Sequence, residues 1–261
     1  MSATTPRRRS GFSLPELLIS FVVLGIIGAG MVRVFVAQTA FYDAQVKQRT
    51  ARTVARSSVN ILLSELRMVE RTGGLEAATA TSVTLRVPLV VGMVCGTLGG
   101  VTFASMLPAD STVIADGDIA GFAWRDGTGA YTYLDGTTAS GGTSAACVVM
   151  ANITTLATGR TVRLSPALPM AATAGDAGFL YQRVRYEFGP SALLPGRRGL
   201  FRTVVGTGSR EELAAPFDTS ARFRFYQLDR DTSDIVTPPV GDIQGLELVF
   251  NATSLRPRSA V

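Results

Sequence analysis

The chain has 261 residues, enough for one sizeable globular domain beside a long helix. It carries 25 Lys and Arg against 20 Asp and Glu, a formal charge of +5, and no histidine. The lack of histidine excludes His-based activation of a nucleophile and His-containing metal sites. The sequence also has no Gly-x-Ser-x-Gly elbow and no glycine-rich loop ending in Gly-Lys. We therefore expect a protein that is not an enzyme and uses no cofactor.

The N-terminal segment joins a basic stretch to a long apolar run. Arg7, Arg8 and Arg9 precede Gly11, and the apolar run that follows contains a single early carboxylate, Glu16. A carboxylate in apolar surroundings is costly unless it finds a partner. We therefore expect Glu16 to lie next to a group that compensates its negative charge.

Three kinds of N-terminal segment begin with a basic stretch and an apolar run. A secretory signal peptide is disfavoured, because residues 33–36 offer no small-residue cleavage site behind the apolar run. A plain signal anchor fits by length, since residues 17–37 are about as long as a helix that crosses a bilayer. In the third kind, cleavage precedes the apolar run, which stays on the mature protein.

The third kind fits residue by residue. Gly11-Phe12-Ser-Leu-Pro-Glu16 resembles the processing signature of type IV prepilins. The resemblance implies cleavage between Gly11 and Phe12 by a prepilin peptidase and N-methylation of Phe12. It also implies that Glu16 pairs with the amino terminus of a subunit in the filament. The three arginines place the leader, residues 1–11, in the cytoplasm, and their removal lowers the formal charge from +5 to +2 (5 − 3).

One long helix is expected to follow the leader. Residues 12–37 would form its transmembrane and filament-core part, and residues 38–74 an amphipathic part that packs on the globular domain. Thr72-Gly73-Gly74 is expected to end the helix, because glycine readily adopts the left-handed C-terminal turn. Small and apolar residues recur in the second part at spacings of three and four: Ala51, Val54, Ala55, Ser58, Val59, Leu62, Leu63, Leu66 and Val69.

Residues 75–255 are expected to form a β-rich domain, and residues 256–261 a flexible tail. The stretch 105–144 is rich in Gly, Ala, Thr and Asp and is expected to be an irregular, variable loop region. The first strands of the domain are predicted at residues 82–87, 112–115, 119–124, 131–134 and 146–150.

Apolar and polar residues alternate clearly in three later segments, at 183–188, 222–225 and 246–250. Such alternation predicts half-buried strands whose apolar faces need a cover. The amphipathic part of the long helix is the obvious cover, so the sequence predicts an α+β fold of the pilin type, with a helix packed on antiparallel sheet.

The chain has two cysteines, Cys95 and Cys147. In an oxidising compartment such a pair is expected to form one disulfide, worth about 3–4 kcal/mol for a loop of this length. Two unpaired buried thiols are the alternative, since the sequence does not give the separation of the Cα atoms.

An acidic cluster in the C-terminal half is a weak candidate for calcium. Asp229, Asp231 and Asp234 supply the carboxylates, but Val240 stands where an EF-hand needs its glutamate and Arg230 lies among the acids. Solvated turn residues are the favoured interpretation, so no metal site is expected.

Four arginines near aromatic residues were weighed as contacts to DNA. Alternating aromatic residues in a strand are more often part of a core, and the charge of the processed chain is modest. Nucleic-acid binding is therefore not expected. The arginines are Arg197, Arg198, Arg222 and Arg224, and the aromatic residues are Phe223, Phe225 and Tyr226.

The C-terminal half resembles two kinds of low-copy filament subunit: minor pilins of the PilW type and the J-type pseudopilin of type II secretion. The resemblance lies in the strand patterns at residues 184–188, 199–202, 222–226 and 243–249. It implies a structural subunit anchored in the bacterial inner membrane with a periplasmic domain, which later enters a pilus or pseudopilus.

The expected partners are other pilins or pseudopilins, the prepilin peptidase and the inner-membrane assembly platform. An adhesin or DNA-uptake receptor on a pilin anchor is the alternative. Its recognition loops would lie in residues 95–160, the part of the chain that the resemblance leaves unmatched.

Overall fold

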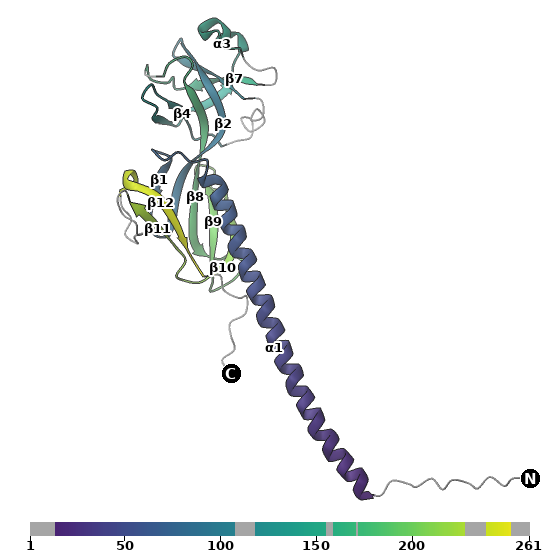
Figure 1. Ribbon diagram of the computed structural model, residues 1–261. Helices are drawn as coiled ribbons and strands as arrows, with labels where there is room; N and C mark the ends of the chain where they lie inside the picture. The colour runs from purple at the N-terminus through teal and green to yellow at the C-terminus, as the bar shows by residue number, and fades with distance from the viewer. Residues whose placement is uncertain (1–13, 108–117, 155–158, 171, 228–238, 252–261) are drawn as a thin grey trace, which may run out of the picture. The chain divides into compact units, whose positions relative to one another are not determined.

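The computed structural model describes residues 14–107, 118–154, 159–170, 172–227 and 239–251 (Figure 1). It divides into two compact units, residues 1–50 and residues 51–261. The helix α1 (Leu14–Leu66) belongs to both, and the β-rich fold lies wholly in the second unit. The predicted α+β fold, with a long N-terminal helix and antiparallel sheet, is confirmed.

α1 ends at Leu66, a few residues earlier than expected, and turns lead from there to the first strand. Thr72-Gly73-Gly74 still closes the segment. Gly73 has a φ of +78°, in the left-handed region that favours glycine. A Cβ on Gly74 would collide with the carbonyl oxygen of Glu70, so both glycines are needed where the chain turns into the sheet.

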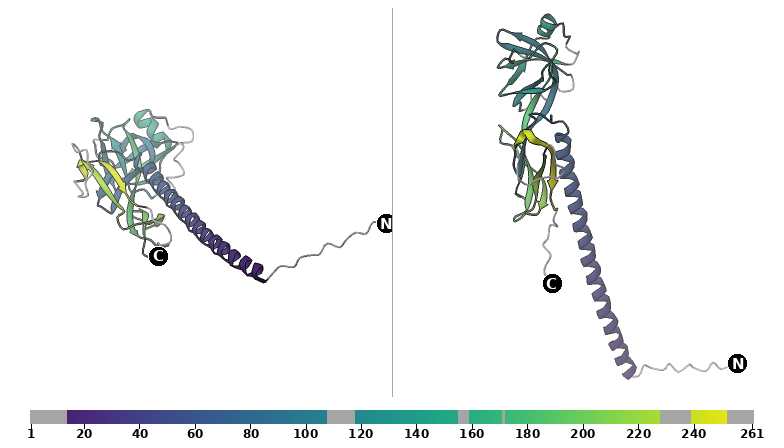
Figure 2. Two further views of the ribbon diagram at one scale, coloured as in Figure 1. Left: turned by 60° about the horizontal axis from the view of Figure 1, so that its bottom comes forward. Right: turned by 60° about the vertical axis from the view of Figure 1, so that its left-hand side comes forward.

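A ten-stranded antiparallel sheet forms the body of the second unit. Its main path runs in the order β10-β9-β8-β2-β3-β7-β6, while β1 pairs with β2, β4 pairs with β8, and β5 pairs with β4. β11 and β12 form a separate two-stranded sheet (Figure 2). The bounds are β1 Leu75–Ala78, β2 Ser82–Leu98, β3 Val101–Met106, β4 Gly121–Arg125, β5 Tyr131–Asp135, β6 Thr138–Gly141, β7 Arg160–Ser165, β8 Ala177–Pro190, β9 Arg198–Val204, β10 Arg210–Phe217, β11 Arg222–Gln227 and β12 Ile243–Val249.

Two predictions about residues 82–150 are wrong. Residues 146–150 were expected to form a strand, but they lie in a helix, α3 (Ser144–Ala151). A short apolar run fits either structure, and here Asn152 closes the helix with a left-handed φ of 53°. Outside the strands predicted at 119–124 and 131–134, residues 105–144 were expected to be irregular, yet they also contain β6.

The other strand predictions agree more closely with the structure. The segment 82–87 is the beginning of the much longer β2, and β4 and β5 lie where strands were expected. The predicted strand at 112–115 lies outside the described residues. The later alternating segments are confirmed as β8, β11 and β12.

The second unit has two main hydrophobic clusters, and the long strands β2 and β8 contribute to both. The first cluster includes Leu62 of α1, which is 2% exposed, together with Tyr186, Phe223 and Phe225. The helix therefore covers the sheet as its apolar stripe predicts. Ser58 is also fully buried, and its hydroxyl donates a hydrogen bond to the carbonyl oxygen of Val54, 2.7 Å away, which satisfies this polar group.

Candidate assembly site

The first unit of the chain is a helix whose apolar surface is left open. The described side chains from Leu14 to Arg49 are exposed, and large apolar residues occur on all sides of the helix. By length and composition α1 qualifies as a membrane-spanning helix. A helix that is apolar all round needs lipid or other protein as its surroundings.

Glu16 lies in the first turn of this open helix. An acidic side chain is stabilised there because the positive end of the helix dipole lies at the N-terminus. The hydroxyl of Ser20 donates a hydrogen bond to the backbone carbonyl of Glu16 at 2.8 Å, which satisfies this polar side chain within the apolar helix. Pro15 also lies in the first turn, where its missing N–H costs no hydrogen bond.

Three glycines interrupt the apolar run of the first unit. A Cβ on Gly25, Gly28 or Gly30 would meet no described atom within 4 Å. Contacts within the chain therefore do not require glycine at these positions. In a membrane or a helix bundle, small residues let neighbouring helices approach closely.

In the second unit, Glu65 connects α1 to the large sheet. Its carboxylate accepts hydrogen bonds from the Nε of Arg202 on β9 at 2.9 Å and from the hydroxyl of Tyr186 on β8 at 2.8 Å. The Arg202 guanidinium also donates to Gln182 at 3.3 Å. Burial of the ring, together with the Glu65 carboxylate, raises the pKa of Tyr186. Glu65, Arg202 and Tyr186 therefore form a polar anchor between the helix and the sheet.

A second polar cluster joins β2, β5 and β8. Arg86 donates to both carboxylate oxygens of Asp135, at 3.3 and 2.9 Å, and to the carbonyl oxygen of Gly73 at 2.8 Å. Tyr181 donates to Asp135 at 2.5 Å. Burial alone would raise the pKa of Asp135, but the hydrogen bonds from Arg86 and Tyr181 outweigh it, so this pKa is lowered. Burial raises the pKa of the nearby Tyr133 to about 12.

Cys95 and Cys147 are bonded, which confirms the first of the two alternatives for this pair. The disulfide joins α3 to β2 across 52 residues of sequence, with a Cα–Cα distance of 4.9 Å. Both cysteines are fully buried, whereas Val149 on the outer side of α3 is 83% exposed. The bridge holds a short helix with an open apolar side chain against the sheet.

The structure brings together few of the residues that the sequence singled out. Arg7, Arg8, Arg9, Gly11 and Phe12 lie outside the described residues. The same is true of Asp229, Asp231 and Asp234. Among the residues that the structure does describe, no group of three or more Asp, Glu, Cys or His side chains has the arrangement of a metal site.

Two of the three aromatic residues considered as stacking surfaces for DNA are part of the core, and the third, Tyr226, is half-buried. Phe223 and Phe225 are fully buried in the first cluster. Arg198 donates to the carbonyl oxygens of Thr219 and Ala221, both at 3.3 Å. Arg224 lies 3.7 Å from a carboxylate oxygen of Glu247 on the neighbouring strand. Phe223 and Phe225 are therefore core residues, as the alternation predicted.

One known family model matches the N-terminal segment of the chain. The model of the prokaryotic N-terminal methylation motif matches residues 6–32, a segment that contains Gly11, Phe12 and Glu16. This N-terminal segment is prepilin-like. Searches of curated proteins and of solved structures found no match.

For a prepilin-like protein, the motif and the apolar helix together support membrane anchoring followed by entry into a filament. They also support a pilin-like or pseudopilin-like role, and interaction in general with other pilins and with prepilin peptidase. The described part of the site is therefore the open helix beginning at Leu14, with Glu16 in its first turn.

Proposed function

We propose that this prepilin-like protein is a minor pilin, an accessory structural subunit in the tip or initiation complex of a type IV pilus. The observation that carries the proposal is a processing motif at residues 6–32 on an apolar helix that is open on all sides. Removal of residues 1–11 leaves this helix at the new N-terminus. Its exposed apolar surface is covered by lipid before assembly and by other subunits afterwards.

In this proposal Glu16 sets the register of the subunit. A carboxylate in the lipid-facing part of a helix is costly, and an amine on a neighbouring subunit offsets that cost in the filament. In the same way, the N-methylated amine of Phe12 would pair with the corresponding carboxylate of the next subunit. Gly25, Gly28 and Gly30 supply positions at which neighbouring backbones can approach closely.

A J-type pseudopilin of a type II secretion system is the first alternative, and it uses the same N-terminal chemistry. Deletion of the chromosomal copy distinguishes the two. Loss of surface pili with normal secretion of exoproteins supports the minor pilin, and the reverse result supports the pseudopilin.

The second alternative is a pilus-borne adhesin or DNA-uptake subunit. The observation in its favour is α3, which the disulfide fixes in place and which exposes Val149. Val149→Asp would reduce adhesion or uptake at normal piliation if α3 were a recognition surface. The proposed minor pilin tolerates the same substitution.

Substitution at the processing site tests the proposed function itself. Gly11→Val is expected to block cleavage, because the bulky side chain occupies the position before the scissile bond. The chain would then migrate as a heavier, leader-bearing band on an immunoblot, and it would be missing from sheared filaments. Ser10→Ala is the matched control, and it should be processed normally. Normal processing of Gly11→Val would show that this segment is not a prepilin leader.

A further inference from the structure

A continuous groove runs between the C-terminal part of α1 and the strand β12. It consists of three adjoining cavities of about 310, 380 and 390 Å³. The first two share Arg71 and Gln244, and the last two share Leu63, Leu66 and Leu246. We call this feature the β12 groove. All of it lies in the second unit of the chain.

The lining of the β12 groove is apolar along its middle. Leu63 and Leu66 of α1 face Leu246 and Leu248 of β12. Leu63 is 40% exposed, so part of the apolar lining is open to solvent. The groove therefore offers open apolar surface at a site where side chains of a ligand could be buried.

One wall of the groove is a strand with an open edge. Within the described part of the chain, β12 pairs with β11 alone, so its other edge carries no ladder of strand hydrogen bonds. The cavities contact every residue from Ile243 to Leu248, as expected for a strand approached from its edge. An open edge of this kind is a template for the addition of an extended peptide.

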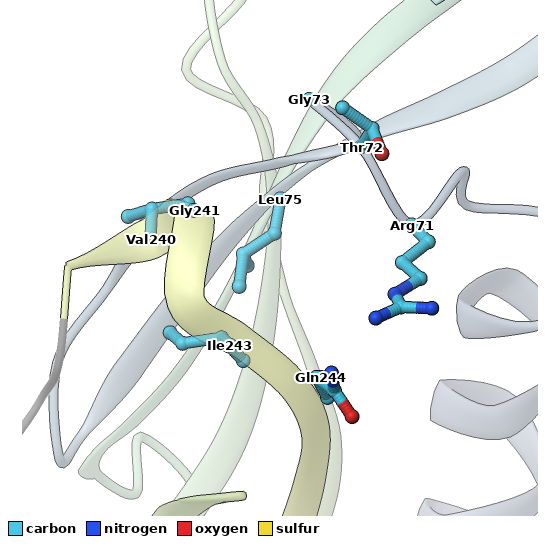
Figure 3. Close-up of a pocket in the computed structure, with 8 residues that line it drawn as sticks. All are labelled: Arg71, Thr72, Gly73, Leu75, Val240, Gly241, Ile243 and Gln244. Carbon is cyan, nitrogen blue, oxygen red and sulfur yellow. The ribbon is translucent and has the colours of Figure 1, made fainter. Parts of the chain in front are cut away.

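The end of the groove near the start of β12 is positively charged. Arg67 and Arg71 line it, against one acid, Glu70. Both arginine side chains are exposed, and no described carboxylate lies within ion-pair distance of either guanidinium. Figure 3 shows Arg71 on the segment that follows α1 and Gln244 near the start of β12, and both line this end of the groove. A ligand that carries a carboxylate at this end complements the exposed charge.

We propose that the β12 groove binds an extended segment of another protein, which adds as a strand to the edge of β12. Apolar side chains of the segment occupy the space between Leu63 and Leu246, and an acidic end lies against Arg67 and Arg71. The proposal goes beyond a pilin-like role, because no residue of the groove belongs to the processing motif or to the open helix of the first unit.

A designed peptide tests the proposal on the full processed chain in detergent micelles. The probe is a blocked, fluorescein-labelled peptide of alternating valine and threonine with two glutamates at one end. A second probe replaces the glutamates with lysines, and a third has N-methyl groups on alternate backbone amides. Fluorescence anisotropy should show about tenfold tighter binding of the acidic probe than of the basic one, as two exposed ion pairs predict. The N-methylated probe should bind at least tenfold more weakly than the acidic probe.

Charge reversal then locates the site. R67E/R71E should reverse the preference between the acidic and basic probes, whereas R52E/R56E, on exposed positions of α1 outside the groove, should leave it unchanged. Bound acidic probe should also slow hydrogen exchange of the amides in residues 243–249. Leu63→Ser should weaken both unmethylated probes.

Three results would overturn the proposal. The first is equal binding of the acidic and basic probes to the unsubstituted chain, and the second is a preference that survives R67E/R71E. The third is concentration-dependent self-association that R67E/R71E abolishes and the acidic probe does not compete with, which would assign the groove to a second copy of the chain.

Discussion

Glu65, in the last turn of α1, accepts a hydrogen bond from the Nε of Arg202 on β9 at 2.9 Å. The two residues are 137 positions apart in the sequence. Their side chains are 18% and 23% exposed, so the pair is partly shielded from water. This pair fixes the end of the helix to the sheet at the point where Leu62 enters the core.

Removal of the arginine should destabilise the second unit. Arg202→Met leaves the Glu65 carboxylate partly buried with only Tyr186 as a described partner, at a cost of about 1–3 kcal/mol. Urea unfolding of the full processed chain in detergent, followed by the fluorescence of the single, buried Trp124, measures this change.

Arg185→Met is the matched control for that substitution. Arg185 lies 3.7 Å from Glu187, and its side chain is 49% exposed, so its loss should change stability by less than about 1 kcal/mol. Equal effects of the two substitutions would show that the pair of Glu65 and Arg202 is not an anchor.

The disulfide should contribute measurably to stability. The double substitution C95S/C147S opens a link across 52 residues, and the expected loss is about 3–4 kcal/mol in the free energy of unfolding. A reducing agent should lower the unfolding midpoint of the unsubstituted chain and leave that of the double variant unchanged. An effect of the reducing agent on both proteins would contradict this assignment.

Asp135 should make the fold sensitive to acid. Its pKa is lowered in the folded chain by hydrogen bonds from Arg86 and Tyr181, which outweigh the effect of burial. A group with a lowered folded pKa stabilises the fold above its unfolded pKa, about 3.9 for Asp, and this contribution is lost as the pH falls through the folded value.

The difference in unfolding free energy between the unsubstituted chain and Asp135→Asn should therefore be largest at pH 7 and shrink toward pH 3. Half of the Asp135 side chain is exposed, so solvent screens its interaction with Arg86 and reduces this difference. Urea titrations at both pH values measure it, and a difference that stays constant between them would contradict the role of the carboxylate charge.

The sequence was most informative where a regular pattern reports burial. Leu62 and Ser58 occur at helical spacing and are buried, and Tyr186 and Phe223 occur in alternating strands and are buried. A local pattern of this kind fixes which face of an element is covered, since side-chain direction follows the period of the backbone.

The polar contacts between distant elements could not be predicted, because no local sequence pattern encodes them. Glu65 and Arg202, or Arg86 and Asp135, meet only because distant strands become neighbours, and a single exposed-looking charge gives no sign of such a partner. Residues 146–150 were mistaken for a strand because a short apolar run is compatible with either structure. Strand β6 was missed because it consists of small and turn-forming residues.

We expect Glu16 to act in assembly and not in processing. Glu16→Ala keeps the scissile bond between Gly11 and Phe12, so the leader should be removed as in the unsubstituted chain. The subunit should then fail to enter filaments, because it lacks the acid that pairs with a neighbouring amine. Asp43→Ala removes another exposed acid of the same helix and should assemble normally.

Immunoblots of sheared filaments and of the membrane fraction from cells that express each variant provide the most direct test. The account predicts a processed Glu16→Ala chain that is present in the membrane and missing from the filaments. A processed Glu16→Ala chain that enters filaments at the level of the unsubstituted protein would contradict it.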